Sequence, residues 1–215
     1  MNLRKLLCIL GLTREQDIFY IGGSDILPPP LEKDAEEGAI AALRQAYPDL
    51  IIIGIEPALK LAADRFPGGN IGVMATPMTL REEKFQALLR RCGETGRVYP
   101  LPAPGIVELV ESGRGEGPQM DGLLEELLGP YRGKLDAVVL GCTHYPFAAR
   151  AISRVLGEGT VLLDGGEGTA RETQRRLSAA GLLLEGTGEL EIRNSLPERR
   201  MIDLCYSLLE QRRES

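Results

Sequence analysis

Residues 135–150, LDAVVLGCTHYPFAAR, contain the clearest strand-to-helix transition in this sequence. The run AVVL is typical of a strand that is buried on both faces of a sheet, and a glycine ends it. A helix is predicted to begin around Pro146, because proline suits the first helical turn. Cys142, Thr143 and His144 are therefore predicted to follow the carboxyl end of a strand, the edge of an open α/β sheet at which ligands bind.

Short apolar runs alternate with amphipathic stretches along the rest of the chain, which is the pattern of a mostly parallel sheet covered by helices. The predicted fold class is α/β. Strands are predicted at residues 18–21, 50–55, 71–75, 98–101, 137–140, 160–163 and 189–193. Helices are predicted at residues 36–46, 58–66, 80–92, 105–112, 120–131, 148–156, 168–180 and 197–211. The least regular segment, residues 22–34, is rich in glycine and proline and is predicted to be a loop.

The composition is that of a globular protein. Of 215 residues, 43% are hydrophobic and 26% are charged, which argues against a disordered or coiled-coil chain. A net charge of −6 argues against binding to nucleic acid, because phosphate groups require a basic surface. No apolar run approaches the roughly 20 residues of a membrane helix. We expect a cytoplasmic protein that binds a small polar ligand or a protein partner, with no nucleic acid and no membrane.

The cysteine content gives further limits. The four cysteines form no CxxC pair and the chain has one histidine, so a common structural zinc site is not expected. Cytoplasmic thiols stay reduced, and a single cysteine can then be reactive. At Cys142, the N-terminus of the following helix is expected to lower the thiol pKa, and His144 can take the proton. Thr143 adds a hydroxyl for a carboxylate ligand. The alternative is that Cys142 is a small buried residue and His144 is structural, as is common for both types.

The string GCTHYPF at residues 141–147 resembles, residue for residue, the second active-site motif of bacterial glutamate racemases. The resemblance extends in order from about residue 49 to the end of the chain. The segments that carry it are IGIEPALK at 53–60, IGVMATPMTLREEKF at 71–85, LPAPGIVELVESG at 101–113 and VLLDGGEGTARETQRRL at 161–177.

The resemblance implies two α/β lobes that face each other across a cleft, with glutamate between them, one cysteine from each lobe and no cofactor or metal ion. It makes Cys142 the acid and base of one face, with His144 assisting it and Thr143 binding the substrate. Thr76 and Thr79 are then expected to line the cleft and hold a carboxylate. A helix cap is the alternative for these two threonines, because Thr79 and the glutamate three residues later have capping-box spacing. The implied division is a first lobe of residues 1–55 and 186–215 and a second lobe of residues 56–185.

The first lobe departs from the family pattern. The DSGxGG loop and the first catalytic motif, Cys-Asn-Thr, are not in this sequence, and residues 1–12 resemble the helix that follows that loop. Pro29 and Pro30 stand where the family has a tyrosine and a glycine that contact the substrate. The other cysteines, Cys8, Cys92 and Cys205, are expected to be packing or surface residues. A parallel sheet that lacks strands exposes edge hydrogen-bonding groups and apolar surface, which favours a homodimer or low stability.

The resemblance implies a glutamate racemase, an isomerase that interconverts L- and D-glutamate by cysteine acid/base chemistry and supplies D-glutamate for peptidoglycan, cell-wall biogenesis and cell shape. The alternative is a catalytically impaired family remnant that binds acidic amino acids or protein partners. A third hypothesis is another member of the aspartate/glutamate racemase superfamily. The histidine of the Cys-Thr-His sequence favours glutamate racemase over that third hypothesis.

Overall fold

The computed structural model describes residues 6–10, 18–20, 44–48, 50–53, 58–81, 86–87, 89–90, 96–183, 191–194 and 198–213. The chain forms two compact units: unit 1 comprises Met1–Glu56 and Gly166–Ser215, and unit 2 comprises Pro57–Gly165. This division differs from the lobes expected from the sequence at residues 166–185, because it assigns the helix that begins at Gly166 to unit 1. None of the described helices combines the length and the apolar character that a membrane span requires.

Unit 2 is built on a parallel sheet with the strand order β4-β3-β5-β6. The strands are β3 (Asn70–Ala75), β4 (Arg97–Pro102), β5 (Ala137–Leu140) and β6 (Val161–Leu163). Each strand agrees with a predicted strand to within one residue at either end. The agreement follows from the burial of the central strands, since every residue of β5 is buried and such strands are continuous apolar runs.

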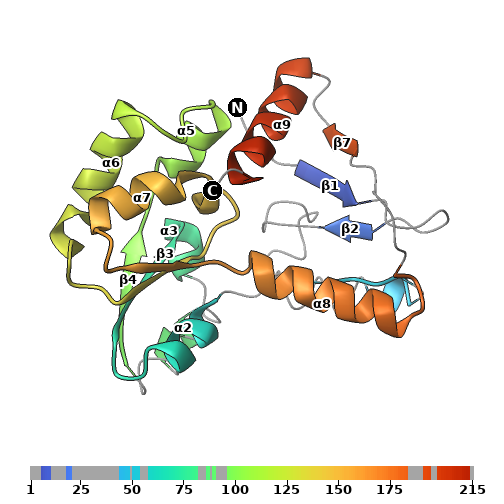
Figure 1. Ribbon diagram of the computed structural model, residues 1–215, viewed down its shortest axis with the longest axis horizontal. Coiled ribbons are helices and arrows are strands. Elements are labelled where there is room, and N and C mark those ends of the chain that lie inside the picture. Colours follow the sequence, from blue (N-terminus) through green and yellow to red (C-terminus); the bar gives the residue numbers. More distant parts are fainter. Residues whose placement is uncertain are drawn as a thin grey trace. The chain divides into compact units, whose positions relative to one another are not determined.

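Helices cover both faces of this sheet (Figure 1). On one face, α2 (Leu59–Arg65) places Leu59 in a buried cluster with Val73 and Val139. On the other face lie α5 (Ile106–Glu111), α6 (Pro118–Leu128) and α7 (Ala149–Leu156). The shorter helical segments are α3 (Pro77–Arg81), η2 (Gly129–Tyr131) and η3 (Tyr145–Ala148). The predicted helices 58–66, 105–112, 120–131 and 148–156 are confirmed. Of the predicted helix 80–92, the described residues 80–81, 86–87 and 89–90 are helical, and residues 80–81 belong to α3.

The sheet of unit 1 corrects one expectation. Its described strands are β1 (Leu6–Leu10), β2 (Ile18–Tyr20) and β7 (Glu191–Asn194), and β1 pairs antiparallel with both neighbours. A mostly parallel sheet was expected in this lobe. Only residues 11–17 separate β1 from β2, which is too short for a parallel crossover of a dozen or more residues. The short loop therefore requires the antiparallel hairpin.

The beginning of the chain was also predicted wrongly. Residues 1–12 resemble a helix, yet residues 6–10 form β1, because a short apolar run fits a buried helix and a buried strand equally well. The segment 50–55 was predicted as a strand, but residues 50–53 lie outside any strand. There the Ile52 carbonyl accepts hydrogen bonds from the Arg44 guanidinium instead of from a neighbouring strand.

The last part of the chain behaves as expected. The predicted strand 189–193 corresponds to β7, which pairs antiparallel with β1. The predicted helices 168–180 and 197–211 correspond to α8 (Gly166–Ala179) and α9 (Arg199–Arg213). Of the predicted helix 36–46, residues 44–46 are described and are helical. The predicted loop 22–34, with its two substituted prolines, lies outside the described residues.

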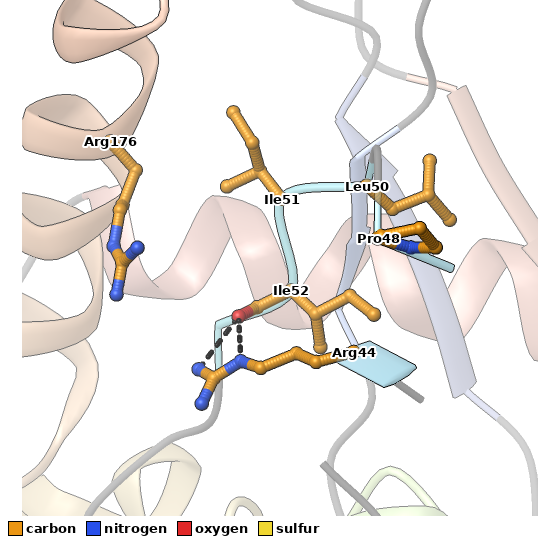
Figure 2. A pocket seen from close by; sticks show the side chains of 6 residues that line it. All are labelled: Arg44, Pro48, Leu50, Ile51, Ile52 and Arg176. Carbon is orange, nitrogen blue, oxygen red and sulfur yellow. Dashed lines mark hydrogen bonds between the residues drawn. The ribbon is translucent and has the colours of Figure 1, made fainter. Parts of the chain in front are cut away.

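Unit 1 contains a cavity of about 330 Å³ (Figure 2). Two arginines contribute to its wall, and the rest of the lining is apolar: the residues are Arg44, Pro48, Leu50, Ile51, Ile52 and Arg176. The Arg44 guanidinium is held by its Nε and Nη2 atoms, which donate to the Ile52 carbonyl at 3.2 and 2.9 Å. None of the site residues expected from the sequence lines this cavity.

Candidate functional site

A four-residue connection between β5 and η3 carries the thiol. Its first residue, Gly141, donates its N–H to the carbonyl of Met74 on the neighbouring strand at 2.8 Å. A Cβ atom at this position would lie 2.7 Å from the same Met74 oxygen, so the close approach of the two backbones requires glycine. Cys142 therefore follows the carboxyl end of β5, as predicted, and the tight connection places it beside the carboxyl end of β3.

Three side chains meet around the single histidine. The Cys142 Sγ atom lies 3.8 Å from His144 Nδ1, and the Thr143 hydroxyl lies 3.4 Å from the same nitrogen. On the other side of the ring, His144 Nε2 lies 3.2 Å from Glu111 Oε1 at the end of α5. A carboxylate accepts only, so Nε2 carries the proton and Nδ1 is the acceptor that faces the thiol. This arrangement of carboxylate, imidazole and thiol can pass a proton between Cys142 and His144.

Burial raises the pKa of the Cys142 thiol. The N–H groups of His144 and Tyr145 and the Thr143 hydroxyl lower this pKa, which is the direction expected for the start of a helix. The net effect is nevertheless upward, because burial removes the thiolate from water and outweighs these hydrogen bonds. The expectation of a lowered thiol pKa was therefore wrong, and the site at rest holds a neutral thiol.

The pKa values of His144 and Glu111 are both shifted in the direction that favours the neutral form. Burial lowers the pKa of His144, and the charge of Glu108 acts in the opposite direction. Burial, followed by repulsion from Glu108, raises the pKa of Glu111. Each shift disfavours a charge in a partly buried position. A neutral imidazole at rest is the form that can accept a proton from the thiol.

Thr76 and Thr79 lie at the end of the strand next to β5. Thr76 follows β3, and its hydroxyl accepts a hydrogen bond from the Thr79 N–H at 3.2 Å, while the two hydroxyls are 2.9 Å apart. Thr76 therefore caps α3, and the predicted cap at Thr79 is displaced by three residues. In the register of the sheet, Met74 lies opposite Leu140, so Thr76 and Cys142 each stand two residues beyond this pair. Thr76 and Cys142 consequently share the carboxyl edge of the sheet.

Glu111 is the residue of the site that no motif in the sequence singles out. It lies in the segment 101–113, which was matched to the family as a whole, but nothing in its spacing separates it from Glu108 one turn earlier. Only the fold brings α5 to the histidine. Of the other cysteines, Cys205 is buried in α9, the side chain of Cys8 is not described, and Cys92 lies outside the described residues. Among the residues that the structure describes, no cluster of three His, Cys, Asp or Glu side chains is arranged to hold a metal ion.

Comparisons with known proteins give a consistent picture. The family described as Asp/Glu/Hydantoin racemase matches residues 37–173. The glutamate racemase of Clostridium perfringens (strain SM101 / Type A) is 43% identical over 179 residues, which is 82% of this chain and 69% of that protein. The structure of Escherichia coli glutamate racemase in complex with L-glutamate is 25% identical with a TM-score of 0.64, covering 82% of this chain and 67% of that chain.

A third comparison concerns the fold alone. The glutamate racemase of Francisella tularensis subsp. tularensis SCHU S4, in complex with D-glutamate, superposes with a TM-score of 0.63 at 20% identity, over 84% of this chain and 66% of that chain. The match confirms the α/β fold with its parallel sheet. The family match over residues 37–173 and the 43% identity to the clostridial protein lead to one assignment: the chain belongs to the Asp/Glu/hydantoin racemase family, in which its relatives are glutamate racemases.

Proposed function

We propose that this chain binds glutamate and moves its α-proton with Cys142, the reaction of one face of a glutamate racemase. The observation that carries the proposal is the array of thiol, imidazole and carboxylate formed by Cys142, His144 and Glu111. The family assignment supplies the substrate class. Such an enzyme would be an isomerase, and the related roles in peptidoglycan synthesis and a cytoplasmic location belong to the same proposal.

The array can perform the proton transfer in two steps. His144 Nδ1 takes the proton of the Cys142 thiol, and Glu111 balances the imidazolium through the Nε2–H hydrogen bond. The thiolate then takes the α-proton, so the thiol forms again and the negative charge passes to the substrate's α-carbon and carboxylate. The raised thiol pKa suits this role, because a thiolate that binds its proton more tightly is a stronger base toward a weakly acidic C–H bond.

Three hydroxyls are proposed to bind the substrate. Thr143 follows the thiol directly, and its side chain is exposed. Thr76 directly follows β3 and Thr79 lies in α3, and their hydroxyls are 2.9 Å apart. Each hydroxyl has one donor and two acceptor positions, so the pair can keep its mutual hydrogen bond and still donate one to a carboxylate oxygen. Thr76, Thr79 and Thr143 are therefore the proposed carboxylate contacts.

Racemisation also requires a proton donor and acceptor on the face of the substrate opposite Cys142. Racemisation by two thiols needs a second base, and the Cys-Asn-Thr motif that supplies it in the resembled family is not in this sequence. We expect racemisation to be slow, because losing a positioned acid or base costs about 10²- to 10⁴-fold. The same observation favours a second candidate function, in which the chain binds acidic amino acids or protein partners without turnover.

Proton NMR in D₂O distinguishes these functions. We expect the wild type to exchange the α-proton of L-glutamate for deuterium with retention of configuration, because solvent deuterium replaces the thiol proton and returns to the same face. Cys142→Ala should lose the exchange, whereas the matched control Cys205→Ala, in α9, should keep it.

Three other outcomes would contradict the proposal. Binding of glutamate in calorimetry without exchange would favour the second candidate. Faster exchange of aspartate would move the substrate class to other members of the family. Interconversion on the order of 1 s⁻¹ or more, a normal enzymatic rate, would show that a second base exists.

A further inference from the structure

Tyr145 is the largest residue of the site motif and the least accessible. Its side chain has 0% exposure, and its hydroxyl donates to the carbonyl of Ala103 at 3.0 Å. Burial raises the pKa of this phenol, so the hydroxyl stays protonated and remains a donor. A buried hydroxyl needs such a partner, because an unpaired one is costly.

The acceptor lies on a different segment from the donor. Ala103 stands between β4 and α5, and its own N–H donates to the Ala75 carbonyl at 3.1 Å. Gly141, in turn, donates to Met74 at 2.8 Å. Three hydrogen bonds therefore join the last residues of β3 to the segments that follow β4 and β5 at the carboxyl edge of the sheet.

The segments after β4 and β5 also carry Glu111 and His144, which form a relay with the Cys142 thiol. His144 is the residue before Tyr145, and Glu111 is the last residue of the helix that follows Ala103. The contact between His144 and Glu111 is 3.2 Å long, near the end of the hydrogen-bonding range, so a displacement of one ångström would break it.

We propose that Tyr145 is a positioning residue, whose buried hydrogen bond to Ala103 sets the distance between His144 and Glu111. This inference rests on the proposed function of the Cys142 array. The alternative is that the ring of Tyr145 only fills space in the core of unit 2. The two roles separate on removal of the hydroxyl, since Tyr145→Phe keeps the ring and leaves the Ala103 carbonyl without its side-chain donor.

A matched control lies at the other end of the same sheet. The hydroxyl of Tyr99, on β4, donates to Asn70 at 3.2 Å at the amino ends of the strands. Tyr99→Phe therefore also removes one hydrogen bond of a tyrosine hydroxyl, but this bond lies away from Cys142, His144 and Glu111. Thermal unfolding of both variants reports the stability that each hydroxyl contributes.

The role of Tyr145 can be tested without enzymatic turnover. The rate at which the Cys142 thiol is alkylated depends on how readily His144 takes its proton. The groups that act on this thiol are His144, Thr143, Glu111 and Tyr145, whose backbone N–H remains in Tyr145→Phe. Glu108 acts on the imidazole through its charge. We expect Tyr145→Phe to slow alkylation of Cys142 by iodoacetamide at pH 8 about tenfold and to shift its pH profile upward, as loss of one hydrogen bond would. Mass spectrometry of the Cys142 peptide separates this thiol from the others. Tyr99→Phe should match the wild type.

A double variant excludes a purely structural effect. In the Glu111→Gln background the relay is already weakened, so Tyr145→Phe should change the alkylation rate little further. An unchanged rate in Tyr145→Phe, an equal loss in Tyr99→Phe, or full additivity with Glu111→Gln would each overturn the inference. If the alkylation rates are as expected but the wild type does not exchange the α-proton of L-glutamate, the proposed function is overturned instead.

Discussion

The two units differ in how their strands are held. In unit 2, β3 has a parallel partner on each side, and helices bury both faces of the sheet. In unit 1, the described sheet joins one short strand to two others, all antiparallel, and its strands come from the two ends of the chain. The thiol site lies entirely in unit 2. The proposed chemistry, which needs positions fixed within an ångström, therefore lies on the unit that contributes most of the buried apolar residues among those that the structure describes.

The largest expected effect is at the connection that carries the thiol. Gly141→Ala would place a Cβ atom 2.7 Å from the Met74 carbonyl oxygen, so one of the two backbones must move. We expect proton exchange of L-glutamate to fall about 100-fold, because a displacement of one ångström costs roughly that factor. The measurement is the NMR exchange rate.

Gly122→Ala is the matched control for that change. Its Cβ meets nothing within 4 Å on α6, and we expect unchanged exchange and a gain of about 0.5–1 kcal/mol in stability. Equal exchange rates in the two variants would show that the close approach at Gly141 does not hold the thiol.

The core of unit 2 provides the next effect. Leu124 of α6 is fully buried, and Leu124→Ala should lower the free energy of unfolding by about 2–5 kcal/mol. Leu61→Ala on α2, where the side chain is 54% exposed, should change it by less than about 0.5 kcal/mol. Urea unfolding measures both. Amide hydrogen exchange adds the comparison between units: Leu124→Ala should expose β3 and β5 more than β1 and β7, and the reverse order would contradict a separate core in unit 2.

A smaller effect concerns pH. Burial lowers the pKa of His144 below its ordinary value of 6.5, so the unfolded chain binds the imidazole proton more readily than the folded chain. Stability should therefore fall as the pH drops through 6.5 and below. His144→Gln removes this loss, and its unfolding free energy between pH 7 and pH 5 should fall less steeply than that of the wild type. Parallel pH dependences would contradict a buried neutral histidine.

The parts of the fold that follow from local pattern were predictable. The strands β3 to β6 are apolar runs with turn signals on both sides, and the motif at residues 141–147 placed Cys142 and His144 at the correct edge. β1 was not predictable as a strand, because its apolar run contains no period that separates helix from strand. The partner of His144 was not predictable either, since Glu111 is 33 positions away in the chain and is selected by the packing of α5.

The tautomer of the single histidine tests the central claim most directly. A ¹⁵N-labelled chain gives one imidazole signal pair, because His144 is the only histidine. The account predicts a neutral ring near pH 7.5 with the proton on Nε2, donated to Glu111, and an unprotonated Nδ1 toward the Cys142 thiol. Glu111→Gln should shift these signals toward a mixture of tautomers. A proton on Nδ1 in the wild type would contradict the account, because the nitrogen that faces the thiol could then no longer accept its proton.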